Sequence, residues 1–316
     1  MMEVQEKTGQ LIYDGERRRK VFAVDGGFGF VKWLWGDRKG KVRSCYKRHG
    51  DVWLIGEKAL LESGSRYLRT VDELVDMYPV FVSFCEEKAG IKDFERDVIV
   101  VGLPHSAWVN DEENGGIYLE KLSNSLKKLG YKDVFLFPQG LGGIKWFLKQ
   151  RPDVGGNILA VDVGFNTVIV VLYSVDEKEI LLSETYYKKG MYDLTVSILL
   201  PKIKRLIKQD RTLTPAELNY LMEHKKFQVG FDAIDVTPEV EESVQEYVED
   251  LISFILNDIK SRFGVVTFNY VLFIGGGANY LRDKISAKKV EIVIPDEPEF
   301  ANVFGFREKA YELLGG

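Results

Sequence analysis

The first half of the chain alternates short apolar runs with polar turns and amphipathic stretches. Apolar runs bounded by Gly, Asp and Lys are typical of strands, and apolar residues at helical spacing are typical of helices. The predicted strands are 21–24, 30–35, 41–46, 52–55, 97–102 and 133–137. The predicted helices are 72–88, broken or re-angled near Pro79, then 116–129, and a third that ends at Lys149.

The pattern restarts after residues 151–156, where one proline and two glycines mark the clearest boundary in the chain. Strands are predicted at 157–162, 167–173, 179–185, 270–274 and 290–294. Helices are predicted over 191–208, from a capping-box start at 214–217, over 237–263, briefly after 275–278, and over 299–314. Each half is a β-hairpin with a third strand, followed by alternating helices and strands, which predicts an α/β architecture with mixed sheets.

A short sequence repeat occurs at residues 22–31 and 159–168. In each copy an apolar run ends in Ala-Val-Asp, and a Gly-Phe pair precedes a second apolar run. Each copy places an aspartate, Asp25 or Asp162, where a strand enters a tight turn beside glycine. Such turns leave backbone N–H groups open to an anion, and a neighbouring carboxylate can hold Mg²⁺ through water. One copy alone is most simply an ordinary hairpin. Two copies in matched surroundings favour a metal–phosphate site.

Three other features could complete such a site. Lys32, on the strand that leaves the first turn, could reach a phosphate, and Asn166 and Thr167 offer side-chain donors at the corresponding place in the second turn. The glycines of 275–277 lie between a strand and a helix, where they permit close approach of a flat ligand or simply form a turn. Gln139 follows a buried strand and could orient a water molecule toward a γ-phosphate, or merely cap a helix.

Composition narrows the range of functions. The chain is 45% apolar and 29% charged, with room for two cores, and its net charge of −5 argues against general nucleic-acid binding. The two cysteines and three histidines show no metal-ligand spacing. With no disulfide framework, no signal-peptide pattern and no apolar run of membrane-spanning length, the expected location is the cytoplasm.

Five segments, in their order along the chain, resemble the motifs of the actin/DnaK/sugar-kinase ATPase superfamily. They correspond to the first phosphate loop, the first connecting helix, the second phosphate loop, the adenosine motif and the second connecting helix. In this sequence they are 24–32, 137–147, 161–167, 273–278 and 299–306. The length and the Gly-Gly-Gly-Ala motif look most like bacterial and archaeal actin-like proteins, including the ParM (StbA) plasmid-segregation type.

The resemblance implies two similar actin-like (ribonuclease H-like) domains with mixed sheets around a nucleotide cleft. Residues 1–20 would be a flexible lead-in. Domain I would comprise 21–150 together with the returning C-terminal helix 299–316, and domain II would comprise 151–298.

The resemblance also assigns roles to individual residues. Asp25 and Asp162 would hold Mg²⁺ through water and, with Gln139, form the catalytic set. The other residues expected to contact the nucleotide are Gly26, Gly27, Phe28, Gly29, Lys32, Gly164, Phe165, Asn166, Thr167, Gly190, Gly275, Gly276, Gly277 and Ala278. Phe28 and Phe165 depart from many relatives, which carry small or polar residues there, so the backbone must supply more of the phosphate contacts. The region 210–235 shows no motif that aligns with the family, so ATP and GTP both stay open.

The function implied is that of a nucleotide-hydrolysing protein that binds Mg-ATP or Mg-GTP and polymerises into filaments. Plasmid or other DNA-cargo segregation is the expected use, and a DNA-binding adaptor protein is a candidate partner, without direct nucleic-acid or membrane binding. The main alternative is a sugar or small-acid kinase of the same superfamily. Such a kinase needs a carboxylate base aimed at an acceptor hydroxyl, whereas this chain has Gln139 at the hydrolytic position. A non-polymerising scaffold that binds nucleotide without turnover is a third class.

Overall fold

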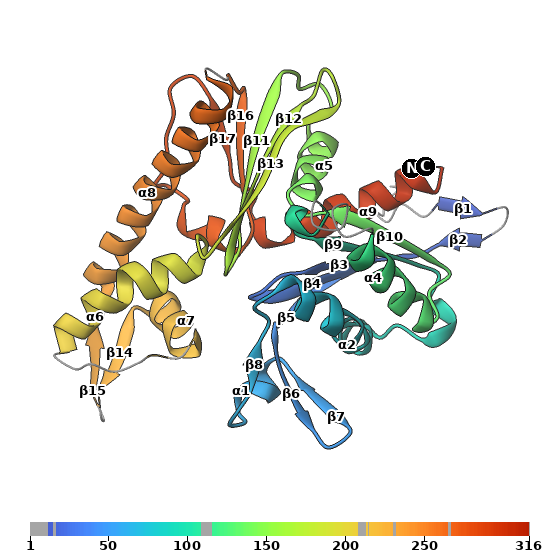
Figure 1. Ribbon diagram of the computed structural model, residues 1–316, viewed down its shortest axis with the longest axis horizontal. Coiled ribbons are helices and arrows are strands. Elements are labelled where there is room, and N and C mark those ends of the chain that lie inside the picture. The colour runs from blue at the N-terminus through green and yellow to red at the C-terminus, as the bar shows by residue number, and fades with distance from the viewer. Residues whose placement is uncertain are drawn as a thin grey trace, which may run out of the picture. The chain divides into compact units, whose positions relative to one another are not determined.

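The protein is described by a computed structural model that covers residues 12–14, 17–108, 116–207, 213, 215–229, 232–264 and 267–315 (Figure 1). The chain divides into two compact units. The first comprises Met1–Val154 and Glu299–Gly316, and the second comprises Gly155–Pro298. Each unit is built on one five-stranded sheet.

The sheet of the first unit is mixed, in the order β10-β9-β3-β4-β5. Strands β3, β9 and β10 are parallel, whereas β4 and β5 continue from β3 as antiparallel strands. The carboxyl ends of the three parallel strands therefore lie at one edge of the sheet. The bounds are β3 (Val21–Gly26), β4 (Phe30–Trp35), β5 (Arg38–Arg43), β9 (Val98–Leu103) and β10 (Asp133–Pro138).

Alternate residues of β3 enter two different cores, because successive strand side chains point to opposite faces. Phe22 and Val24 pack with α2 (Val71–Ala89) and α4 (Ile117–Lys128) on one face. Val21 and Ala23 pack with α9 (Ala301–Leu313) on the other. Figure 1 shows α2 and α4 on the side of the sheet opposite α9.

Helix α2 runs unbroken through Pro79, where the sequence predicted a helix that is broken or re-angled. Its two ends are well defined, because the Thr70 side chain accepts the Glu73 N–H at 3.2 Å and Gly90 closes the helix in the left-handed conformation. Burial of one whole face of the helix outweighs the single hydrogen bond that proline removes.

The predicted strand 41–46 is two strands. β5 ends at Arg43 and β6 (Cys45–His49) begins a separate three-stranded sheet with β7 (Val52–Ile55) and β8 (Arg66–Tyr67), beside the short helix α1 (Glu57–Leu60). Ser44, which lies between the two strands, directs its N–H to the carbonyl of Gly29 instead of to a sheet neighbour. A one-residue turn of this kind leaves no trace in the hydrophobic pattern.

Part of the expected lead-in, residues 1–20, forms a β-hairpin. β1 (Ile12–Asp14) pairs with β2 (Arg17–Arg19) as an antiparallel hairpin. The Arg19 guanidinium donates to Asp97, which directly precedes β9, and to Asp133 of β10, so the hairpin is bonded to this edge of the sheet. The other residues of 1–20, apart from Lys20, lie outside the described part of the chain. A one-turn 3₁₀ helix, η1 (Asp93–Glu95), follows α2.

The sheet of the second unit repeats that arrangement strand for strand, in the order β13-β12-β11-β16-β17. β11, β12 and β13 are successive antiparallel neighbours, and β16 and β17 run parallel to β11. The predicted pair of similar α/β domains with mixed sheets is thus confirmed. The bounds are β11 (Asn157–Val163), β12 (Thr167–Ser174), β13 (Glu179–Tyr187), β16 (Tyr270–Ile274) and β17 (Glu291–Val293).

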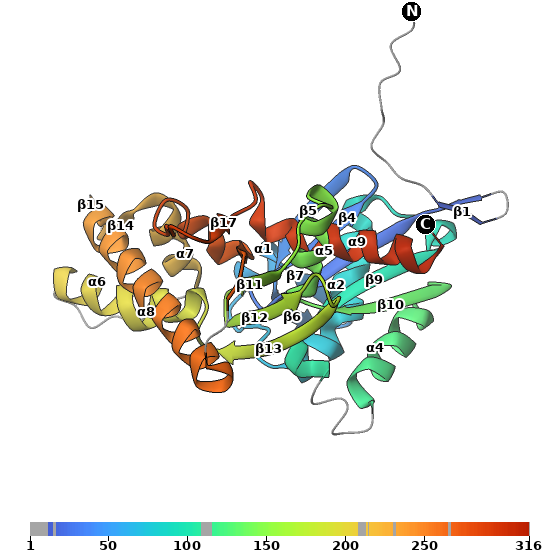
Figure 2. The same ribbon diagram turned by 90° about the horizontal axis from the view of Figure 1, so that it is seen from above.

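The helices of the second unit pack around one large core against this sheet. Figure 2 shows α6, α7 and α8 grouped with the β14–β15 hairpin at one end of the unit. The capping residue Thr214 lies outside the described residues. The remaining bounds are a π-helical turn η2 (Asp193–Leu199), α6 (Leu200–Ile207), α7 (Pro215–His224), β14 (Lys226–Val229), β15 (Asp232–Asp235), α8 (Thr237–Phe263), η3 (Gly276–Tyr280) and η4 (Pro298–Phe300).

In the first unit, α9 and α5 (Leu141–Gln150) touch backbone to backbone. A Cβ added to Gly305 would lie 1.7 Å from the carbonyl oxygen of Gly142, and one added to Gly142 would lie 2.8 Å from that of Asn302. Only glycines permit this approach, because any side chain would force the helices apart.

We expect Gly305→Ala to lower the free energy of unfolding by about 1–3 kcal/mol, the usual cost of overpacking. Urea unfolding followed by circular dichroism measures it. Gly276→Ala is the control, because a Cβ there meets no atom within 4 Å. Unchanged stability of Gly305→Ala would contradict the tight contact between the helices.

Candidate functional site

The sequence repeat folds into the same tight turn in both units. Between β3 and β4, Gly26 pairs with Val31, and the Gly27 N–H donates to the carbonyl of Phe30 at 3.2 Å. Between β11 and β12 the pair is Val163 and Val168, and the N–H of Gly164 donates to the carbonyl of Thr167 at 2.9 Å. Each turn is therefore closed by the same hydrogen bond, from the glycine N–H to the carbonyl three residues later.

Ser44 donates hydrogen bonds to two carbonyl groups of the first turn. Its hydroxyl donates to the carbonyl of Gly27, and its N–H donates to that of Gly29 at 2.9 Å. The backbone N–H groups of Phe28 and Gly29 donate to no group among the residues that the structure describes. The turn therefore has two open N–H donors, while its Gly27 and Gly29 carbonyls are already bonded, an arrangement that favours an anion.

In the second unit, the segment 188–192 bonds to the carbonyl groups of the turn. Three of its backbone N–H groups donate to successive turn carbonyls, and the turn N–H groups of Phe165 and Asn166 have no acceptor within the described ranges. The bonds run from Met191 to Gly164 at 3.0 Å, from Tyr192 to Phe165 at 2.7 Å, and from Lys188 to Asn166 at 2.6 Å.

Gly190 is required for this contact. A Cβ at that position would lie 2.3 Å from the carbonyl oxygen of Gly164 and 2.8 Å from that of Phe165. Gly190 therefore supports the second turn from behind, a role that its place in the sequence did not reveal.

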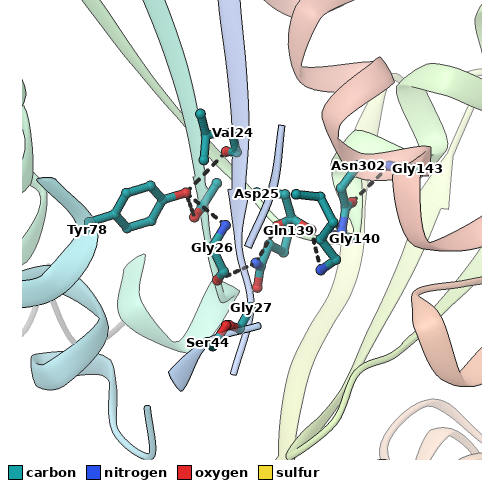
Figure 3. A network of polar contacts seen from close by, with 12 residues as sticks. Val24, Asp25, Gly26, Gly27, Ser44, Tyr78, Gln139, Gly140, Gly143 and Asn302 are labelled. Carbon is teal, nitrogen blue, oxygen red and sulfur yellow. Dashed lines mark hydrogen bonds and ion pairs between the residues drawn. The ribbon is translucent and has the colours of Figure 1, made fainter. Parts of the chain in front are cut away.

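Asp25 is buried and bonded on both carboxylate oxygens (Figure 3). Gln139 Nε2 donates to Asp25 Oδ1 at 2.6 Å and to the carbonyl of Gly26 at 3.1 Å, while Lys32 Nζ lies 2.9 Å from Asp25 Oδ2. Gln139 reaches this place because β3, β9 and β10 are parallel, so that the residue after β10 meets the end of β3. Its own N–H donates to the carbonyl of Leu103 at the end of β9, at 2.8 Å.

Tyr78 holds the same strand end from the opposite face (Figure 3). Its hydroxyl accepts the N–H of Gly26 at 2.9 Å and lies within donating distance of the carbonyls of Val24, at 3.1 Å, and Gly102, at 3.0 Å. Burial, and then the negative charge of Asp25, hold the pKa of Tyr78 well above its ordinary value, so the hydroxyl keeps its proton.

Sequence reasoning did not single out Tyr78. The available signal was a tyrosine on the apolar stripe of a helix, since a buried tyrosine hydroxyl usually has a partner.

The second unit places Asp162 beside the glycine triplet. β11 and β16 are parallel and pair Asp162 with Ile274, so Gly275 comes next to the carboxylate. Gly275 has a φ of 81°, and a Cβ on it would lie 2.3 Å from Asp162 Oδ1. A Cβ on Gly277 would lie 2.4 Å from Val163 Cγ1, whereas Gly276 faces open space and Ala278 is buried.

The two aspartates differ in their cross-strand neighbours. Asp25 lies opposite Lys32, but Asp162 lies opposite Ile169. The sequence interpretation put Asn166 and Thr167 at the place corresponding to Lys32. The register corrects this, because those two residues belong to the turn itself.

Each unit thus brings its own predicted residues together at one sheet edge. The first unit gathers Asp25, Lys32, Gln139 and the turn 26–29. The second gathers Asp162, the turn 164–167, Gly190 and residues 275–278.

Residues 160–287 match the family model described as archaeal actin homologue MreB-like, C-terminal. A ParM filament from Clostridium botulinum superposes with a TM-score of 0.72 at 18% identity, covering 93% of this chain and 99% of that one. The chain has the actin-like fold. The resemblance inferred from the five motifs is thereby confirmed.

Two further structures are similar to this actin-like chain. An archaeal actin homologue in complex with ADP has a TM-score of 0.74 at 18% identity, over 92% of this chain and 99% of that one. MreB5 of Spiroplasma citri bound to AMPPNP has a TM-score of 0.64 at 12% identity, over 94% and 98%. No curated protein matches the chain in sequence.

We expect Tyr78→Phe to destabilise the protein by about 1–3 kcal/mol, because it leaves the buried N–H of Gly26 without an acceptor. Urea unfolding monitored by tryptophan fluorescence measures the change. Tyr220→Phe, at a half-exposed position on α7, is the matched control. If both variants were as stable as the wild type, the Tyr78 hydroxyl would not be holding the strand end.

Proposed function

We propose that this actin-like protein binds a nucleoside triphosphate with Mg²⁺, hydrolyses it slowly, and assembles into filaments in response. The observation that carries the proposal is the pair of matched turns, each of which has two open backbone N–H groups and most of its carbonyls already bonded. Phosphate oxygens are acceptors only, so a turn with open N–H donors suits them. Two structural relatives were solved with bound ADP and AMPPNP, which supports this ligand class.

The residues present fit a magnesium ion that is held mainly through its own water. Among the described residues, no group of three or more His, Cys, Asp or Glu lies close enough together to ligate a metal directly. Mg²⁺ keeps several waters and needs only one or two carboxylates plus substrate phosphates. Asp25 and Asp162 would supply those carboxylates, and the bound ion would neutralise charge on the phosphates.

Gln139 would orient the attacking water. Its amide cannot remove a proton near neutral pH, so it contributes position and a hydrogen bond, which predicts slow turnover. Lys32, paired with Asp25, would supply positive charge to the β- or γ-phosphate.

Filament assembly and a role in segregating plasmids or other DNA cargo, through a DNA-binding adaptor, complete the proposal. The ParM filament among the structural relatives supports assembly. Both cysteines are buried and unpaired, which supports a reducing cytoplasm. Within the described residues, no helix has the length and apolar character needed to cross a membrane.

We expect Asp25→Asn and Asp162→Asn each to remove most of the Mg²⁺ dependence of nucleotide binding, a loss of roughly tenfold, or about 1.4 kcal/mol. A fluorescent ATP analogue titrated with Mg²⁺ and with EDTA measures it. The ratio of the two affinities is the readout, because Asp25→Asn also frees Lys32 to attract phosphate directly.

Asp250→Asn, on the exposed face of α8, is the control for that experiment. A wild-type ratio in both turn variants would remove the two aspartates from the metal site.

We further expect Mg-ATP or Mg-GTP, but not the nucleotide-free state, to produce assembly. Light scattering and pelleting with each nucleotide test this. If no nucleotide produced assembly while a panel of sugars accelerated ADP release, the small-molecule kinase would replace the filament-forming ATPase.

A further inference from the structure

Gln139 is fixed on its sheet side by three hydrogen bonds but leads directly into a helix that has no cap of its own. Its N–H and its side-chain amide are bonded to Leu103, Asp25 and Gly26, and only 5% of the residue is exposed. The next residue, Gly140, is the N-cap of α5 and has φ 84° and ψ −50°. This left-handed conformation favours glycine, so the cap position lacks a side chain.

Asn302, from α9, supplies the missing cap (Figure 3). Its Oδ1 accepts the N–H of Gly140 at 3.1 Å and that of Gly143 at 3.2 Å. These belong to the first turn of α5, where backbone N–H groups have no acceptor within the helix. Asn302 is itself 3% exposed, so water does not offer an easy substitute.

The contact between α5 and α9 leaves Asn302 little freedom to move. Its own backbone carbonyl lies against Gly142, and one helical turn later Gly305 meets the same glycine. α5 ends shortly before the first unit gives way to the second at Val154, and α9 begins shortly after the chain returns at Glu299. Asn302 therefore joins the two helices that lie next to the two connections between the units, one at Val154 and one at Glu299.

We propose that Asn302 is a positioning residue for Gln139. By holding the N–H of Gly140, it fixes the peptide that joins Gln139 to α5, and with it the direction of the Gln139 amide. The proposal rests on the proposed function, because it concerns the water that Gln139 would orient. Nucleotide affinity is set by the turns and the glycine triplet, so loss of Asn302 lowers turnover and leaves affinity unchanged.

A double-mutant cycle tests this. The variants are Asn302→Ala, Gln139→Ala and the double mutant, with kcat from phosphate release and Kd from a fluorescent ATP analogue. Asn302→Ala should reduce kcat by roughly tenfold to a hundredfold, the effect of a misplaced positioning group, with Kd within about twofold of the wild type. The double mutant should be no slower than Gln139→Ala alone, because the two residues act in one chain of contacts.

Asn302→Asp is the conservative variant, since a carboxylate oxygen can accept the same two N–H groups at a helix N-terminus. It should restore most of the turnover that Asn302→Ala loses. Asn124→Ala is the matched control and should keep wild-type turnover. Asn124 is an exposed residue on α4, and its side-chain amide donates to Glu120. Circular dichroism melting confirms that each variant is folded.

The possible results separate the two proposals. A wild type without turnover of Mg-ATP or Mg-GTP overturns the proposed function and this inference with it. A wild type that turns over, together with a folded Asn302→Ala of equal kcat, overturns this inference alone. Fully additive losses in the cycle, or an Asn302→Asp as slow as Asn302→Ala, would also overturn it, because they point to a general effect on packing.

Discussion

The candidate chemistry depends on where the carbonyl groups of two hairpin turns find their hydrogen bonds. A tight turn normally offers an anion both donors and acceptors, and the acceptors repel it. Here Ser44 bonds to the carbonyls of Gly27 and Gly29 in the first turn, and the segment 188–192 bonds to those of Gly164, Phe165 and Asn166 in the second. Each turn keeps two open N–H groups, and neither turn contains an arginine. Because the backbone supplies the donors, bulky residues such as Phe28 and Phe165 are compatible with anion binding.

The two turns are alike in backbone and unlike in charge. Lys32 pairs with Asp25 across β3 and β4, whereas the apolar Ile169 lies opposite Asp162. The first carboxylate is thus paired with a cation of its own unit, and the second lies close to Gly275.

Glycine also sets the packing behind the first turn. Gly142 and Gly305 allow α5 and α9 to touch, and Gly26 leaves room for the ring of Tyr78, from which a Cβ would lie only 2.5 Å away. Tyr78 and Asn302 then satisfy polar groups that this close approach buries. The first turn is therefore supported by Tyr78 from outside the motifs and by contacts between the two connecting-helix motifs, 137–147 and 299–306.

The sequence by itself determined the α/β class, most strand positions, the repeat and the two aspartates, because these depend on local periodicity and on glycine-rich turns. It also singled out Gln139 and the glycine triplet through their places after buried strands. Only the tertiary structure decided which residues become partners. Tyr78 and Asn302 come from helices that are remote in sequence from the groups they bond, and Gly190 contacts a turn more than twenty residues earlier in the chain. The strand register makes Ile169 the counterpart of Lys32. It also decided that α2 continues through Pro79. Hydrophobic patterns report which face of an element is buried, but hydrogen-bond partners depend on which elements become neighbours, and only the assembled sheets fix that.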